Sequence, residues 1–200
     1  MKFLNLISNY LLYTIVLGLV YPIMVYGIGI LSFPKESKGS LLQNSEGITI
    51  GSKWLSQNFQ NPKYFSPRPS AKNFEALPSG ASNLSATSRE LKDQVERRLN
   101  SLENKWNING EIQVKWDRNS VPDELKFASS SGLEPFISFE TALWQVPFVA
   151  KFRNTKEQNI IRVLETHRIQ PLIGIFGRDR VHVVELNLAL DKEFPIKNIR

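Results

Sequence analysis

The pattern of hydrophobic and polar positions divides the chain near residue 33. Residues 11–33 (LLYTIVLGLVYPIMVYGIGILSF) form a run of 23 residues without a charged side chain. At about 1.5 Å per residue, a helix of this length spans roughly 34 Å, which is enough to cross a hydrocarbon core about 30 Å thick. Backbone groups at that depth are satisfied only within a helix, so the run predicts a transmembrane helix. We therefore expect a short lead over residues 1–10, a membrane helix over 11–33 and a soluble domain over 34–200.

Two other interpretations of this run are weaker. A cleaved signal peptide would have a shorter apolar core and a small-residue cleavage site, and no alanine precedes Ala71. A buried helix of a soluble protein rarely continues this long without a polar face. Within the expected helix, Pro22 removes a backbone donor and predicts a kink near Gly18. Gly18, Gly27 and Gly29 are small positions at which another helix can approach closely.

The segments that follow the expected membrane helix alternate between loops and short elements. Residues 35–47 are expected to form a loop, residues 47–51 a short strand, and residues 52–59 an amphipathic helix with its apolar side chains inward. Residues 61–86 contain four prolines and many Ser, Asn and Gly residues, which excludes a regular helix or a central strand. Aromatic side chains in this segment require burial, so we expect an ordered loop, and long loops of this kind are often functional.

Helix signals recur in the second half of the chain. A capping box at residues 87–90 opens a helix expected to end near Trp106, and a second box at residues 155–158 opens a helix to about His167. Ser138 is expected to start a helix over residues 139–145. Two interpretations of Pro147 are open: it interrupts this helix, or it is the first residue of a second, short helix. A helical turn is expected at residues 122–125.

Strands are expected at three further places, residues 111–116, 172–176 and 181–190. The last run changes phase at Val183–Val184, which we interpret as a bulge or as burial on both faces. Helices and strands are mixed without a strict βαβ order. The predicted fold class is α/β (mixed α+β), with one transmembrane helix followed by a single domain that contains a small sheet.

Composition and charge exclude several function classes. The chain carries a net charge of +6, of which Lys2 is the only charge before Lys35, and it contains no run of five like charges and no cysteine. Nucleic acid is therefore not an expected partner, and disulfides and cysteine-based metal sites are excluded. The basic residues that flank the two ends of the expected membrane helix nearly balance, so charge does not fix its orientation.

Candidate chemistry is sparse. The two histidines, His167 and His182, have no second ligand at metal spacing, and phosphate-binding and nucleophile-elbow motifs are absent, so we assign no metal site and no catalytic residue. The serine cluster at residues 129–131 has the character of a turn. The alternatives that remain open are a membrane-anchored extracytoplasmic enzyme that uses this serine loop and a membrane-anchored binding protein.

Eight stretches occur in the order and spacing of one known family. They are VYPIMVYGIG, FPKESKGSLL, GSKWLSQNF, YFSPRPSA, SGASNLS, ASSSGLEPFIS, WQVPFVAK and VVELNLALD. Together, from about Val20 to Asp191, they resemble the C subunit of the bacterial Kdp-type potassium-transporting ATPase.

The resemblance implies an accessory, non-catalytic subunit that crosses the cell inner membrane once and holds its domain outside the cytoplasm. Its partners would be a channel-like potassium-binding subunit, a P-type ATPase subunit and a small peptide subunit, within membrane lipid. The complex takes up potassium at high affinity at the expense of ATP. The C subunit is needed for assembly and is described as a catalytic chaperone that raises the ATP affinity of the ATPase subunit. No cofactor is expected to bind tightly, and ATP would act through the ATPase subunit.

The resemblance also assigns candidate residues. It implies a nucleotide contact at Gln145. We expect partner contacts at Phe65, Arg68, Ser70 and Asn83, and helix packing at the positions already named, Gly18, Pro22, Gly27 and Gly29.

The sequence departs from the family pattern at several positions. Phe148 stands where a basic residue is common, Phe136 where a polar residue or His is usual, and Ser66 where His is common; residues 104–118 match poorly. The loss of charge at Phe148 argues against phosphate binding by this segment. A domain outside the cytoplasm cannot touch ATP bound inside, so any effect on ATP affinity must pass through other subunits as a coupling between states.

Overall fold

The computed structural model describes residues 2–44, 47–107, 116–171, 174 and 176–195. The chain forms two compact units, Met1–Leu42 and Gln43–Arg200, and each is described by itself.

The first unit is a long apolar helix interrupted by one π-helical turn. It consists of α1 (Lys2–Ile15), the π-helical turn η1 (Val16–Val20) and α2 (Tyr21–Ser32). Residues 3–32 are long and apolar enough to cross a membrane. The π-helical turn directly precedes Pro22, at the place where the sequence predicts a kink, and π-helical turns are an established cause of helix bending. Residues 2–10 belong to the same helix, because they too are uncharged beyond Lys2 and largely apolar.

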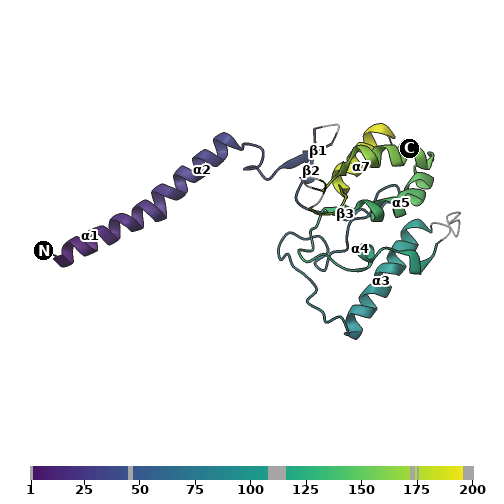
Figure 1. The fold of residues 1–200 in the computed structure, drawn as a ribbon, viewed down its shortest axis with the longest axis horizontal. Helices are drawn as coiled ribbons and strands as arrows, with labels where there is room; N and C mark the ends of the chain where they lie inside the picture. Colours follow the sequence, from purple (N-terminus) through teal and green to yellow (C-terminus); the bar gives the residue numbers. More distant parts are fainter. Residues whose placement is uncertain (1, 45–46, 108–115, 172–173, 175, 196–200) are drawn as a thin grey trace. The chain divides into compact units, whose positions relative to one another are not determined.

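The second unit is a mixed α and β domain, which confirms the predicted fold class. Its main sheet has the order β3-β5-β4 and is antiparallel throughout, with Ile137 opposite Val181 and Arg168 opposite Val181. The strands are β3 (Phe136–Ser138), β4 (Arg168–Ile169) and β5 (Arg180–His182). Three helices pack with this sheet around the main hydrophobic core (Figure 1): α5 (Phe139–Phe152), α6 (Glu157–Thr166) and α7 (Val183–Glu193).

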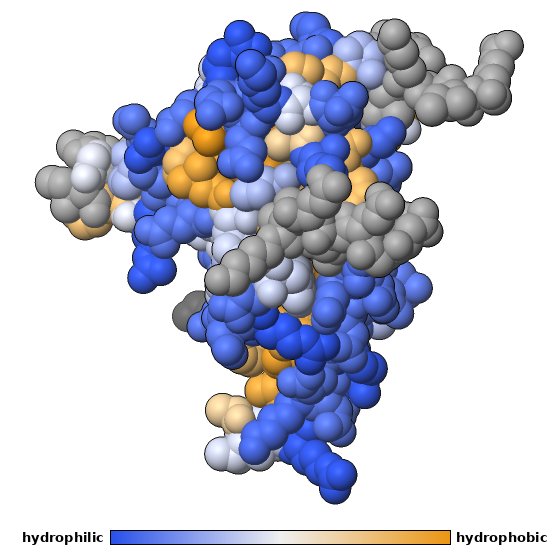
Figure 2. All heavy atoms as spheres, turned by 90° about the vertical axis from the view of Figure 1, so that its right-hand side faces the viewer, coloured by the Kyte–Doolittle hydropathy of each residue, from blue (hydrophilic) through white to orange (hydrophobic). Residues whose placement is uncertain are grey.

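A second, smaller core lies between two other helices, α3 (Arg89–Trp106) and α4 (Asp123–Lys126). Its buried residues are Leu99, Val121 and Leu125. A short 3-10 helix, η2 (Arg118–Ser120), precedes α4, and β1 (Leu41–Gln43) pairs with β2 (Thr49–Ser52) in a two-stranded sheet. Figure 2 shows one face of the molecule, on which hydrophilic side chains predominate and the hydrophobic areas are small and separate.

Several predicted elements are confirmed. Residues 61–86 contain neither helix nor strand, α3 ends at Trp106, and α4 occupies the expected helical turn. Ser138 caps α5, since its hydroxyl accepts a hydrogen bond from the Thr141 N–H at 3.2 Å.

The strand predicted over residues 181–190 is wrong beyond His182. The chain leaves β5 there and continues as α7, because His182 Nδ1 accepts the Glu185 N–H at 3.2 Å and so caps the helix. Val183, Leu186 and Leu190 then recur at spacings of three and four and are fully buried. The phase change in the sequence pattern therefore marks a transition from strand to helix, not a bulge.

The helix predicted over residues 52–59 is also wrong. Residues of this stretch bond to other segments: the Ser56 backbone N–H donates to Leu133 O at 3.0 Å, and the Gln57 side-chain Nε2 donates to Ile50 O at 2.6 Å. Trp54, expected to face inward, is 58% exposed. The preceding loop expected over 35–47 likewise contains β1.

Helix boundaries differ in smaller ways. Ser88, not Thr87, caps α3, and α6 begins after Lys156 without a side-chain cap, because the Thr155 hydroxyl accepts from Asn159 Nδ2 instead. Pro147 lies inside α5 and does not interrupt it, since the residues beside it, Val146 and Phe148, are buried in the domain.

Of the predicted strand 111–116, residues 111–115 lie outside the described residues and Trp116 is not in a strand. Most of the predicted strand 172–176 also lies outside them, and the chain contributes β4 earlier, at Arg168–Ile169.

Candidate functional site

The irregular segment 59–66 enters the interior of the domain at Phe65 and Ser66, where two amide side chains hold it. Gln145 on α5 accepts the Ser66 N–H at 2.7 Å and donates to the Ser66 carbonyl at 3.1 Å. Asn187 on α7 makes the same pair of bonds to Phe65, at 2.9 and 3.0 Å. Both amides are buried and hydrogen-bonded. The helices α5 and α7 therefore bind the backbone of two consecutive residues of the segment. We call Gln145 and Asn187 the amide clamp.

A lysine at the end of α3 holds the same segment from another side. Lys105 Nζ donates to the carbonyls of Phe59 and Tyr64, both at 2.9 Å, and to the Ser66 hydroxyl at 2.7 Å. It also lies 5.2 Å from the centre of the Trp106 ring. Burial of the ammonium group lowers the pKa of Lys105 to about 7, because desolvation penalises the charged form.

Arg153 at the end of α5 provides a third attachment. Its side chain is 1% exposed and donates to three backbone carbonyls, those of Lys63 (2.7 Å), Leu190 (3.0 Å) and Phe194 (3.1 Å). Its Nη2 also pairs with Asp191 at 2.8 Å. One guanidinium therefore ties the irregular segment to the end of α7.

Tyr64 completes this attachment. Its hydroxyl donates to Asp191 Oδ2 at 2.8 Å, and its ring lies 5.2 Å from the Arg153 guanidinium. Burial and the hydrogen bond to Asp191 raise the pKa of Tyr64 to about 12, so the phenol stays protonated. Tyr64, Arg153 and Asp191 therefore bond to one another and stabilise the fold of this region.

Four aromatic rings pack together beside this region. Phe148 stacks on Trp106 at 4.8 Å between ring centres and contacts Trp144 at 5.1 Å, and Trp116 contacts Trp144 at 5.8 Å. Phe148 is buried among these rings, which gives a physical reason for an aromatic rather than a basic side chain at this position.

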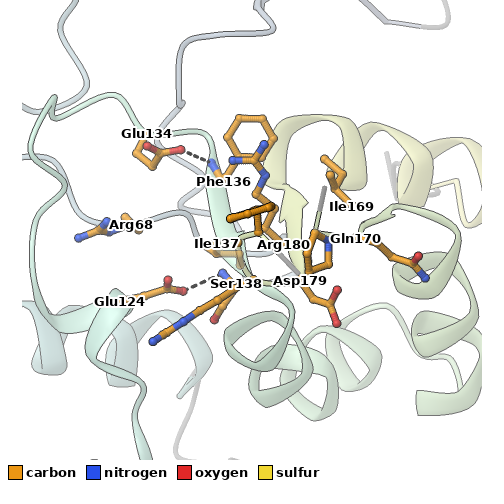
Figure 3. Close-up of a pocket in the computed structure, with 14 residues that line it drawn as sticks. Arg68, Glu124, Glu134, Phe136, Ile137, Ser138, Ile169, Gln170, Asp179 and Arg180 are labelled. Carbon is orange, nitrogen blue, oxygen red and sulfur yellow. Dashed lines mark hydrogen bonds between the residues drawn. The ribbon is translucent and has the colours of Figure 1, made fainter. Parts of the chain in front are cut away.

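A pocket of about 510 Å³ lies beside β3, and several charged side chains line it (Figure 3). We call it the arginine pocket, since three arginines line it: Arg68, Arg178 and Arg180. Carboxylates line it as well, and Figure 3 marks the bonds of Glu134 and Glu124 to backbone N–H groups of β3.

Of the residues expected at functional sites, two are buried and the others lie closer to solvent. Gln145 is fully buried and its two polar atoms already bond Ser66, so a nucleotide would reach it only if the irregular segment left its place. Phe65 is 0% exposed and lies in the main core, where its ring offers no surface to a partner.

The other expected contact residues are closer to solvent. Arg68 is partly buried and lines the arginine pocket, and Asn83 is exposed. Ser70 is partly buried, and its hydroxyl accepts the N–H groups of Lys72 and Phe74, both at 3.0 Å, so it shapes the loop. At Gly18, Gly27 and Gly29, an added side-chain carbon would meet no atom of this chain within 4 Å.

The serine loop lacks an assigned base. Ser129 is buried, and the Ser131 hydroxyl accepts the Leu133 N–H at 3.1 Å. Both histidines are engaged elsewhere: His182 with Lys53 and Glu185, and His167 with the Val163 carbonyl at 2.9 Å. Within the described residues, no group of three or more His, Cys, Asp or Glu side chains could hold a metal ion.

The sequence interpretation missed three residues that organise this region, namely Lys105, Arg153 and Asn187. One sequence signal was present, because Asn187 is an amide within the apolar run LNLAL, where an unpaired polar group would be costly. Lys105 and Arg153 stand at helix ends, where basic residues are ordinary, and gave no such signal.

The chain therefore combines one helix that is long and apolar enough to cross a membrane with a mixed α and β domain, which, over the described residues, is the class of a protein with a single candidate membrane-spanning helix. A family model described as KdpC, K+-transporting ATPase, c chain, matches residues 3–192, and the chain belongs to this family.

Relatives match over almost the whole chain. Proteins named "Potassium-transporting ATPase KdpC subunit" are 37% identical in Allorhizobium ampelinum, 38% in Rhodospirillum rubrum and 39% in Leptospira interrogans. These matches cover 92%, 92% and 98% of this chain and 93%, 91% and 98% of the relatives, respectively.

Proposed function

We propose that this chain is the non-catalytic accessory subunit of an ATP-driven potassium uptake complex of the inner membrane. The observation that carries the proposal is the family match over residues 3–192, with relatives named as subunits of a potassium-transporting ATPase. The partners are a channel-like potassium-binding subunit, a P-type ATPase subunit and a small peptide subunit. The chain itself supplies an anchor and a rigid domain, and the chemistry belongs to the ATPase subunit.

The test is co-expression of the full chain with these three partners. The tagged chain should retain them in detergent, and potassium-stimulated ATP hydrolysis should fall when the chain is omitted. If the partners do not co-purify with the chain, and omission leaves hydrolysis unchanged, the proposal fails.

The finer proposal is that the chain raises the ATP affinity of the ATPase subunit without touching ATP. Its support is the amide clamp, since the atoms of Gln145 that would meet a nucleotide are buried and bonded to Ser66. Equilibrium binding of ATP to the purified full chain in detergent tests this, and saturable binding that Gln145→Glu abolishes would support a direct contact instead.

Membrane orientation is part of the proposal, with the domain outside the cytoplasm. An epitope added after Arg200 should be cleaved by protease in intact right-side-out vesicles. Cleavage only after the vesicles are opened would place the domain inside.

A further inference from the structure

The carboxylates that line the arginine pocket have hydrogen-bond or ion-pair partners, whereas its arginines have few. Each of its carboxylates already has a partner: Glu134 accepts the Phe136 N–H at 3.2 Å, Glu124 accepts the Ser138 N–H at 2.8 Å, and Asp179 pairs with Arg168. The two glutamate contacts also satisfy backbone N–H groups of β3, which is an edge strand of the sheet.

The three arginines lack comparable partners. Arg68 makes one long hydrogen bond, 3.4 Å from Nη2 to the Ala128 carbonyl, and its Nε is buried without a hydrogen-bond partner. The Arg180 guanidinium lies 4.6 Å from the centre of the Phe136 ring, and Arg178 is exposed. Within the described part of the chain, none of the three forms an ion pair with a carboxylate.

The pocket also has apolar walls. Phe136 forms part of β3, and Phe176, which is 69% exposed, and Ile169 line the pocket beside the arginines. In Figure 3, Arg68 lies on one side of β3, and Arg180 extends over Phe136. The guanidinium groups and apolar side chains are spread over more surface than one small ion can contact. An extended polypeptide can contact all of them.

We propose that the arginine pocket binds an acidic, extended segment of another protein subunit, with carboxylates on Arg68, Arg178 and Arg180 and apolar side chains on Phe136 and Phe176. Guanidinium groups bind carboxylates through paired N–H donors, and stacking on an aromatic ring leaves the donors at the edge of a guanidinium free. This inference rests on the proposed function, because the partner is a subunit of the same complex.

Zero-length cross-linking tests the proposal in the assembled complex. Arg178→Lys and Arg180→Lys keep the charge and supply an amine that a carbodiimide joins to a carboxylate in contact. Both side chains are exposed, so the domain should fold. We expect a cross-linked peptide that joins position 178 or 180 to an Asp or Glu of another subunit. Arg97→Lys, at an exposed position on α3, is the matched control and should give none at its own position.

A second variant measures the contribution to assembly. Arg178→Gln combined with Arg180→Gln should lower the retention of the chain by the complex about fivefold at moderate salt, and Arg89→Gln with Arg97→Gln, which removes the same charge elsewhere, should not.

If the unaltered chain co-purifies with its partners but neither position cross-links and the double variant is retained like its control, this inference is overturned while the proposed function stands. If instead the double variant loses binding to phosphatidylglycerol vesicles and not to the complex, the occupant is a lipid headgroup and the inference is also overturned. Failure of the unaltered chain to co-purify would reject the proposed function itself.

Discussion

Replacement of Gln145 by leucine separates a structural role from nucleotide binding. The side chains are similar in size, but Gln145→Leu removes both bonds to Ser66 and leaves a buried N–H and a buried carbonyl without partners. Each buried polar group left unsatisfied costs about 1–3 kcal/mol, so we expect a loss of about 3 kcal/mol in the free energy of unfolding.

This loss should be visible as a lower midpoint of thermal unfolding. For a domain of this size, 1 kcal/mol corresponds to about 2–4 °C, so the midpoint should fall by about 6–12 °C. Asn187→Leu removes the equivalent bonds to Phe65 and should cost a similar amount. Tryptophan fluorescence of the full chain in detergent is a suitable signal, because three tryptophans pack together near the clamped segment.

Gln158→Leu is the matched control. Gln158 is exposed on α6, and exposed substitutions of this kind usually change stability by about 0.5 kcal/mol or less. If Gln145→Leu unfolds at the wild-type temperature while Asn187→Leu is strongly destabilised, the clamp does not depend on Gln145 and the structural account of this residue is refuted.

Three further predictions concern the other attachments and the membrane helix. The folded-state pKa of Lys105, about 7, lies below its unfolded value, so the unfolded chain binds more protons and stability should rise by about 2 kcal/mol between pH 7 and 9. Lys105→Met should abolish this rise in thermal unfolding, and a flat wild-type profile would show that its three acceptors keep the ammonium protonated. Arg153→Met leaves the Lys63 and Phe194 carbonyls without the hydrogen bonds that Arg153 donates, and it should lower the unfolding midpoint by about 6–12 °C, while Arg162→Met, at an exposed position, should not. An added Cβ at Gly18 or Gly29 meets no atom of this chain within 4 Å, so Gly18→Leu and Gly29→Leu test packing on a partner helix. Loss of co-purification, with the thermal unfolding of the domain unchanged, would report such packing, and unchanged co-purification would leave the helix as a tether alone.

The elements that were predictable from the sequence depend on local chemistry. The apolar helix follows from a long run without charge, and α3 follows from its stripe of Leu91, Val95, Leu99 and Leu102. The absence of helix and strand over residues 61–86 follows from the four prolines there. The strand predicted over 181–190 failed because valines favour strands, and a cap formed by a histidine ring is not among the usual helix signals.

The organisation around the irregular segment was not predictable in this way. Gln145 bonds a residue 79 positions away and Asn187 one 122 positions away, and such pairs leave no trace in local periodicity. Gln145 was singled out by resemblance to the family, and the structure gives it a physical reason to be an amide that does not involve nucleotide. The arginine pocket likewise assembles Arg68 and Arg180 from distant segments.

The clamped position of Gln145 has a thermodynamic consequence for the proposed effect on ATP affinity. If the chain acts without touching ATP, the effect is a coupling between two binding events, and such couplings are reciprocal. ATP bound to the ATPase subunit must then tighten the hold of the complex on this chain by the same factor, typically about 5- to 150-fold. Dissociation of the labelled chain from the complex, measured with and without a non-hydrolysable ATP analogue, should show this factor. A dissociation constant that the analogue leaves unchanged would refute the proposed effect on ATP affinity, because a change in one equilibrium affinity requires an equal change in the other.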